Sequence, residues 1–322
     1  MNHQDGAQPC PMKKTTIGGQ AIIEGIVMKG PRKSSTVVRK SDGELVIRDK
    51  DAAPLTEKSK VFGWPVVRGM VTLFMALKDG MEAINYSAQF FDDEEDAGEP
   101  SKFEQWLEKR LGSQKLEKLV MGFATVVGIA LPVALFILLP TFLAGFLPEG
   151  VHSVVRNLIE GAVRVIIFLC FMWGVSHMKD IRRTFEYHGA EHKTIFCYEA
   201  GEELTVENVR RQGRFHPRCG TSFLFVVIII ATLVSSLVFA FIQPTNPFVR
   251  ALLHLLLLPL VVGLSYEVNR YAGRKDNTLT RALRWPGLKL QHLTVFEPDD
   301  SMIEVAIEAM RRVIPDDGSD NW

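Results

Sequence analysis

The sequence has few cysteines and no excess of charge of either sign. Only four cysteines occur in 322 residues and none forms a C-x-x-C pair, so a disulfide framework is not expected. Lysine plus arginine and aspartate plus glutamate each total 37, so the net charge gives no indication of nucleic-acid binding. The first residues are polar and lack the apolar core of a cleaved signal peptide. We therefore expect internal segments to target the chain.

Apolar residues are abundant and concentrated in four blocks. Residues 119–147 and 221–242 contain no charged residue. Each exceeds the roughly 20 residues that a helix needs to cross the hydrocarbon core of a bilayer. Residues 151–177 are apolar overall but are interrupted by Glu160 and Arg164, and residues 251–266 form a shorter block that 247–249 can extend. These blocks predict four transmembrane helices, the first kinked by its internal prolines.

Charged residues interrupt the second block. Glu160 and Arg164 lie four apart, so they share a helical face and can form an ion pair. Such a pair can face the interior of a helix bundle. We favour the alternative, in which both side chains snorkel at the outer interface. His254 lies in the fourth block, where we expect a packed polar group.

The basic residues predict the orientation. The connections 148–156 and 243–250 hold one arginine each, whereas residues 178–220 and 268–289 are rich in lysine and arginine. By the positive-inside rule, both termini and the middle segment are expected in the cytoplasm.

The polar segments predict a mixed cytoplasmic part. Residues 36–48 fit a β-hairpin with Asp42-Gly43 in its turn. The glycines of 18–25 suit a tight turn or a close backbone approach. Residues 61–76 fit a helix that lies in the membrane interface or packs under the helix bundle, and a further helix is expected to start at 299–301.

We thus expect an α-helical polytopic membrane protein with about four transmembrane helices and a cytoplasmic α+β portion. Its segments, in order, are an N-terminal cytoplasmic region, a transmembrane hairpin, a histidine-rich cytoplasmic segment, a second transmembrane hairpin and a cytoplasmic tail: 1–118, 119–177, 178–220, 221–267 and 268–322.

The middle segment contains the pattern H-x-x-E-H. His188 and His192 lie four apart, so on a helix both imidazoles project from one face and can share a metal ion. Glu191 stands beside them. In inverzincins this pattern provides two zinc ligands and a glutamate that activates water. We therefore predict a divalent metal, zinc by preference, with Glu191 as general base.

His216 and Cys219 form a second pair of zinc-competent residues, separated by Pro217-Arg218. Together with His188 and His192 they would complete a tetrahedral set. Four protein ligands would make the zinc structural, whereas a catalytic zinc keeps one position for water. If the ion is catalytic, we expect that one of the four is not a ligand.

Other groups can join the site or replace the metal. Inverzincins take a third ligand from a downstream glutamate, and Glu199, Glu203 and Glu207 are all candidates. Glu267 and Asn269 follow the last apolar block at the same expected depth, although a simple helix end explains them better. The histidines can instead hydrogen-bond to nearby carboxylates in a purely structural network.

Four stretches resemble one bacterial family, the YqhQ family of membrane proteins: GGQAIIEG at 18–25, HGAEHK at 188–193, HPRCGT at 216–221 and EPDD at 297–300. The resemblance covers the chain from about residue 13 to 314. The family is described as predicted metal-dependent enzymes of unknown function. It implies a multi-pass protein of the bacterial inner membrane, with a metal and no known substrate.

Three functions remain open. The leading hypothesis is a metal-dependent hydrolase at the cytoplasmic membrane surface. The second is a membrane scaffold or assembly factor held together by a structural zinc or a polar network. The third is a small transporter or channel that uses Glu160, Arg164, His254 and Glu267. Four spans are few for a transporter, so the partners expected besides the lipid bilayer are a second copy of the chain or another membrane protein.

Overall fold

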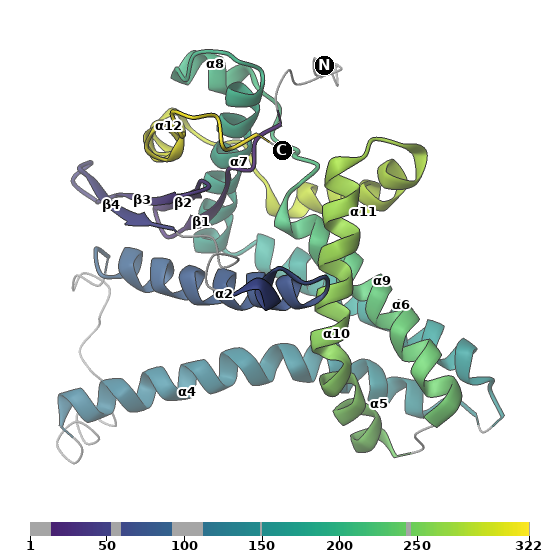
Figure 1. The fold of residues 1–322 in the computed structure, drawn as a ribbon. Helices are drawn as coiled ribbons and strands as arrows, with labels where there is room; N and C mark the ends of the chain where they lie inside the picture. Colours follow the sequence, from purple (N-terminus) through teal and green to yellow (C-terminus); the bar gives the residue numbers. More distant parts are fainter. Residues whose placement is uncertain (1–13, 53–58, 92–111, 149, 243–245, 322) are drawn as a thin grey trace, which may run out of the picture. The chain divides into compact units, whose positions relative to one another are not determined.

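The computed structural model describes residues 14–52, 59–91, 112–148, 150–242 and 246–321 (Figure 1). The chain is mostly helical, with one small sheet. It divides into two compact units. Unit 1 comprises Met1–Phe91, Phe171–Ile230 and Pro259–Trp322, and unit 2 comprises Asp92–Cys170 and Ala231–Leu258.

The sheet of unit 1 has four antiparallel strands in chain order: β1 (Gly18–Ile22), β2 (Gly25–Lys29), β3 (Lys33–Arg39) and β4 (Leu45–Asp51). The hairpin predicted over 36–48 is β3–β4, in which Arg39 pairs with Leu45. Gly43 turns the chain at φ +88°, a left-handed conformation that glycine adopts without strain. The predicted hairpin is therefore confirmed.

The glycine-rich stretch 18–25 forms β1 and the turn into β2. A side chain at Gly25 would collide with the Val37 carbonyl oxygen of β3, so the expected close backbone approach is present. Glu24 occupies the turn with φ 47°.

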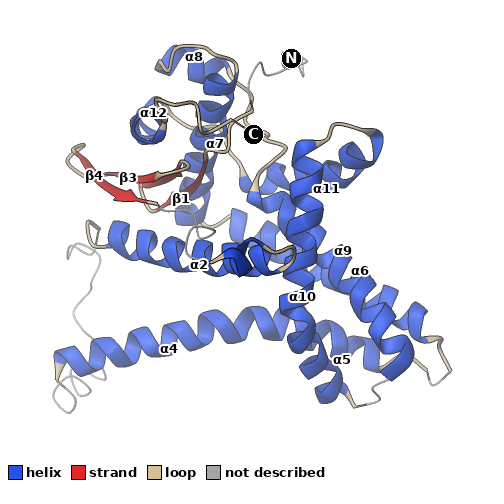
Figure 2. Ribbon diagram, in the orientation of Figure 1, coloured by secondary structure: helices blue, strands red, loops and turns tan. Residues whose placement is uncertain are grey.

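Helices cover both faces of the sheet (Figure 2). Successive strand residues point to opposite faces. Ile26 and Met28 of β2 therefore face α7 (Lys179–Glu199) and α12 (Asp300–Val313), whereas Val27 faces α2 (Val67–Ala88). The result is a three-layer arrangement of helices, sheet and helix.

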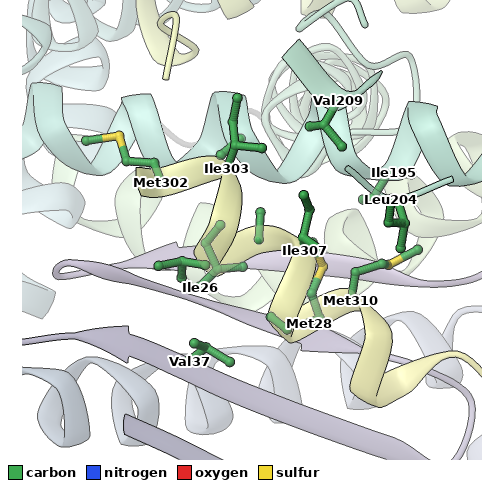
Figure 3. Packing of buried hydrophobic residues seen from close by; sticks show 14 of the residues in the cluster. Ile26, Met28, Val37, Ile195, Leu204, Val209, Met302, Ile303, Ile307 and Met310 are labelled. Carbon is green, nitrogen blue, oxygen red and sulfur yellow. The ribbon is translucent and has the colours of Figure 1, made fainter. Parts of the chain in front are cut away.

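The main core lies between the sheet, α7 and α12 (Figure 3). Its fully buried side chains come from the sheet, α7 and α12 and include Ile26, Met28, Val37, Tyr187, Ile303 and Met310. The C-terminal helix predicted at 299–301 is α12, and the Asp299 carboxylate caps it by accepting from the Met302 amide. This helix therefore closes the core, as its apolar pattern indicates.

The remaining unit 1 elements are shorter or flank the core: η1 (Lys60–Gly63), α8 (Val206–Arg211) and α11 (Thr278–Thr294). The helix predicted over 61–76 begins later and runs further, as α2. The chain before it is interrupted by Pro65 and by Val66 at φ 68°. Helix α2 exposes an apolar stripe formed by Phe74, Leu77 and Met81.

Among the described residues, four helical stretches are long and apolar enough to cross a membrane: Gly122–Gly145, Ser153–Ser176, Phe223–Ile242 and Pro247–Arg274. They match the four predicted blocks. The first contains parts of α4 (Ser113–Val133), the π-helical turn η2 (Ala134–Leu138) and α5 (Leu139–Gly145). Its irregular turn follows Pro132, as expected where proline removes a backbone hydrogen bond. The others belong to α6 (Ser153–Ser176), α9 (Gly220–Ile242) and α10 (Pro247–Arg274).

Unit 2 buries an ionic network between its helices. Glu160 and Arg164 are only 2% and 6% exposed, so the expected snorkelling is wrong and the pair faces the protein interior. The Glu160 carboxylate also pairs with Arg250 at 2.7 Å and lies 2.8 Å from His254 Nε2, and it accepts from the Thr141 hydroxyl. The pair stays inside because α10 brings these further partners, which the spacing within α6 does not reveal.

The transporter hypothesis grouped four residues. Three of them, Glu160, Arg164 and His254, belong to this network in unit 2. Glu267 belongs to unit 1 and forms a two-point ion pair with Arg68 of α2.

We expect Glu160→Ala to destabilise the protein by about 3–5 kcal/mol, because it leaves two buried arginines without their carboxylate. Thermal unfolding in a neutral detergent measures this as a lowered midpoint. The control is Glu44→Ala, which breaks an exposed ion pair with Lys40 and should cost less than about 1 kcal/mol. Equal midpoints for the two variants would contradict the role of Glu160.

Helix α7 packs closely at Gly189. A side chain there would collide with the Phe296 carbonyl oxygen, and Pro298 is also adjacent. We expect Gly189→Ala to lower the free energy of unfolding by about 1–3 kcal/mol, because the added methyl group forces the 296–298 segment away from α7. Gly174→Ala, in a helical position with open space, is the control and should not lower the unfolding midpoint. An unchanged unfolding midpoint for Gly189→Ala would contradict this prediction and show that the 296–298 segment moves away at little energetic cost.

Candidate functional site

Helix α7 supplies three of the predicted site residues. His188, Glu191 and His192 lie at positions i, i+3 and i+4, so they share one side of the helix. His192 and Glu191 are buried, with 1% and 5% exposure, because the sheet and α12 cover α7. The H-x-x-E-H pattern therefore lies on a helix within a packed core, as the spacing predicts.

Cys219 lies at the end of the loop that leads into α9. Its amide donates to the His216 carbonyl at 3.3 Å, which closes a tight turn around Pro217 and Arg218. The turn places Cys219 Sγ 3.2 Å from His188 Nε2. Candidate ligand atoms of His188, His192 and Cys219 all lie within 4.8 Å of one another. Three of the four predicted ligands thus converge.

Two backbone carbonyls orient the histidines. Thr294 O lies 3.0 Å from His188 Nδ1, and Arg214 O lies 2.6 Å from His192 Nδ1. A carbonyl oxygen only accepts, so each Nδ1 carries the hydrogen. Each Nε2 of a neutral ring is then an acceptor. This is the arrangement in which a histidine binds a metal through Nε2 and donates its other N–H to the protein.

Glu191 lies beside this group and contacts strand β1 of the sheet. Its carboxylate accepts a hydrogen bond of 2.9 Å from the amide of Gly19 in β1. A side chain at position 19 would meet that carboxylate, so glycine permits the approach. Burial raises the pKa of Glu191 to about 7, and the nearby His188 partly offsets the shift.

Burial also affects the other members of the group. It lowers the pKa of His192 to about 4, so this ring is neutral at pH 7, the form that binds a metal. For Cys219, burial alone would raise the pKa. The interactions with His192 and Thr221 outweigh burial and lower it.

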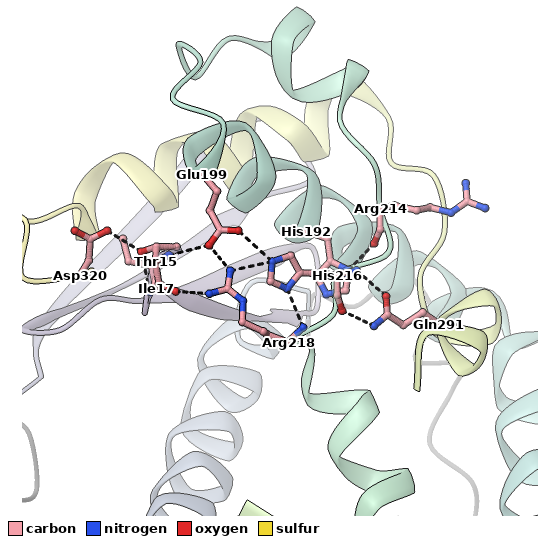
Figure 4. A network of polar contacts seen from close by, with 9 residues as sticks. All are labelled: Thr15, Ile17, His192, Glu199, Arg214, His216, Arg218, Gln291 and Asp320. Atoms are coloured by element: carbon pink, nitrogen blue, oxygen red, sulfur yellow. Dashed lines mark hydrogen bonds and ion pairs between the residues drawn. The ribbon is translucent and has the colours of Figure 1, made fainter. Parts of the chain in front are cut away.

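His216 has different neighbours from the other three (Figure 4). Its Nε2 lies 3.6 Å from the Glu199 carboxylate, and its ring centroid lies 5.5 Å from that of His192. Glu199 also pairs with Arg218 and accepts from the Thr15 amide at 2.7 Å. Burial raises the pKa of Glu199, but its contacts with His216 and Arg218 outweigh burial and lower this pKa. His216 is thus outside the converging group and belongs to an adjoining polar network.

The three glutamates predicted as possible metal ligands, Glu199, Glu203 and Glu207, differ in their surroundings. Glu203 and Glu207 are exposed, and Glu199 is the one that faces a histidine. Glu267 pairs with Arg68, so it does not join the histidine group. Asn269 lines a cavity near the end of α10.

Several groups that hold the site residues in place were not predicted from the sequence. Gln291 of α11 holds both backbone groups of His216, accepting from its N–H at 2.8 Å and donating to its carbonyl at 2.7 Å. The Gly19 amide and the carbonyls of Arg214 and Thr294 are main-chain groups, which no residue pattern reveals. The buried Gln291 gives no sequence signal either.

A family model described as "Protein of unknown function (DUF1385)" matches residues 64–316. The "Uncharacterized protein YqhQ" of Bacillus subtilis (strain 168) is 34% identical over 304 residues, which cover 92% of each chain. No solved structure matches. These matches confirm the resemblance to the YqhQ family, and the chain belongs to this family of proteins of unknown function.

Proposed function

We propose that the chain is an integral membrane protein of the bacterial inner membrane with a cytoplasm-facing, metal-dependent hydrolase site. The observation that carries the proposal is the convergence of His188, His192 and Cys219 with both histidines oriented through Nδ1. Four apolar helices support membrane insertion. The basic residues of 178–220 and 268–289 support the cytoplasmic orientation of the site and of both termini.

The donor set fits a divalent metal, with zinc preferred. Two imidazole nitrogens and one thiolate are ligands that zinc favours. Without a cation the group lacks hydrogen atoms: two Nε2 acceptors face one thiol, which can donate to only one of them. A bound cation would satisfy all three atoms.

Three ligands make the proposed site catalytic rather than structural. A tetrahedral zinc with three protein ligands keeps its fourth position for water, and the metal lowers the pKa of that water. His216 is not required as a ligand, because Glu199 and Arg218 already engage its ring.

Glu191 has the role of general base in this proposal. Its carboxylate is fixed by the Gly19 amide, beside His188 and Cys219, and the surrounding core excludes bulk water. One oxygen bonded to Gly19 leaves the other to hold a proton taken from water and return it to a leaving group.

Metal analysis tests the ligand set. We expect about one zinc per chain in protein never exposed to chelator, and its loss in His188→Ala/His192→Ala. After substitution with Co²⁺, a thiolate charge-transfer band should be present in the wild type and absent in Cys219→Ser. His216→Ala should retain both metal and band, measured on the folded fraction from size exclusion. A metal-free wild type, or a His216→Ala protein as depleted as the double variant, would contradict the three-ligand site.

Replacement of Glu191 tests catalysis. Glu191→Gln should keep the metal but reduce hydrolysis of ester, amide or phosphoester probes by about 10²–10⁴-fold, because the base is lost while the ligands remain. Glu203→Gln, an exposed position, is the control. If Glu191→Gln retains the wild-type rate, the base is misassigned.

The scaffold hypothesis predicts a different pattern. Its specific support is the network of Glu199, His216 and Arg218, which ties Thr15 near the N-terminus to the core. A structural metal would make Cys219→Ala lower the unfolding midpoint while Glu191→Gln has no effect on any measured property.

A further inference from the structure

A cavity of about 550 Å³ lies in unit 1 beside the last turns of α10. Its size is within the range of small-molecule sites in proteins. Its wall combines residues from α2, from α10 and from the turn that precedes Cys219. None of the residues that line it is a candidate metal ligand or Glu191, so it is a separate feature.

The lining of this cavity is strongly basic. Within the part of the chain that the structure describes, no aspartate or glutamate lines it, whereas four arginines do: Arg68, Arg218, Arg270 and Arg274. Arg270 and Arg274 lie four apart on α10, so they share one face of that helix. Arginines from three separate segments thus line one space. A guanidinium carries five N–H donors, so the donors that do not bind protein groups can bind an anion with several oxygen atoms.

Two of the arginines are held in place by contacts with other parts of the protein. Arg68 forms a two-point ion pair with Glu267, and Arg218 pairs with Glu199 while donating to the Thr15 carbonyl at 2.9 Å. Neither carboxylate is part of the lining. Because these contacts fix the side chains before a ligand arrives, less conformational entropy is lost on binding.

The rest of the lining suits a polar head attached to an apolar body. Tyr266, Asn269 and Thr72 add polar side chains, and Phe62 and Val71 add apolar surface. The cavity lies at the basic end of an apolar helix, and α2 beside it exposes the stripe of Phe74, Leu77 and Met81. Apolar surface next to arginines is typical of a protein at the headgroup level of a bilayer.

We propose that this cavity binds a phosphate-bearing polar group. The two sources of that chemistry are the headgroup of an anionic membrane lipid and a soluble phosphate ester. The lipid source uses the proposed membrane insertion, whereas neither source depends on the proposed metal.

The test uses the full chain in micelles of a neutral detergent. A fluorescent short-chain phosphatidic acid is titrated with protein and followed by anisotropy. Arg270→Gln/Arg274→Gln should weaken its binding by about fivefold per arginine. The control is Arg182→Gln/Arg281→Gln, which removes the same charge from exposed positions outside the cavity and should bind as the wild type does. Elution and unfolding midpoints verify that both variants fold.

Competition then identifies the source. Displacement of the probe by short-chain phosphatidic acid but not by glycerol 1-phosphate supports a lipid headgroup. Displacement by glycerol 1-phosphate at a similar concentration supports a soluble phosphate ester. No binding by the wild type, or equal weakening in the cavity variant and the control variant, would overturn the proposal, since only general charge attraction would then remain.

Discussion

The candidate site depends on two hydrogen bonds from imidazoles to backbone carbonyls. Because Thr294 O and Arg214 O take the Nδ1 hydrogens, His188 and His192 both turn an Nε2 acceptor toward Cys219. The carbonyls come from the end of α11 and from the loop after α8. Both segments must therefore dock on α7 before the histidines acquire their orientation. The packed core supplies this precision, since α7 is buried between the sheet and α12.

The short turn of residues 216–219 contributes both to the group of candidate metal ligands and to the basic cavity. Gln291 forms hydrogen bonds with both backbone groups of His216, and Arg218 forms an ion pair with Glu199. The next residue, Cys219, faces the histidines, whereas Arg218 lines the basic cavity. A change that displaces this turn would disturb both places together. His188 and His192 on α7, and Arg270 and Arg274 on α10, lie outside this turn, so their replacement leaves its sequence unchanged.

The sequence predicted features governed by local rules. The β3–β4 hairpin follows from Asp42-Gly43, the four apolar helices from their length, and the position of His188 and His192 from their spacing. Features set by distant partners were not accessible. Glu160 was expected at the interface because Arg250 and His254, its further partners, lie some ninety residues away in the sequence. His216 and Cys219 have equivalent ligand chemistry, and only the fold decides that Cys219 converges with the other two.

Buried polar clusters in the two units support opposite conclusions. In unit 2 the Glu160 carboxylate accepts from Arg164, Arg250 and Thr141 and lies beside His254, so its oxygens find their partners within the protein. Removing this carboxylate would leave two arginines uncompensated, which gives it a structural role that needs no ligand. The group of His188, His192 and Cys219 offers two ring acceptors and one thiol hydrogen, so its members cannot satisfy one another. A buried shortage of donors is costly, and a bound cation removes it. The count of hydrogens, more than the presence of histidines, distinguishes a candidate metal site from a structural network.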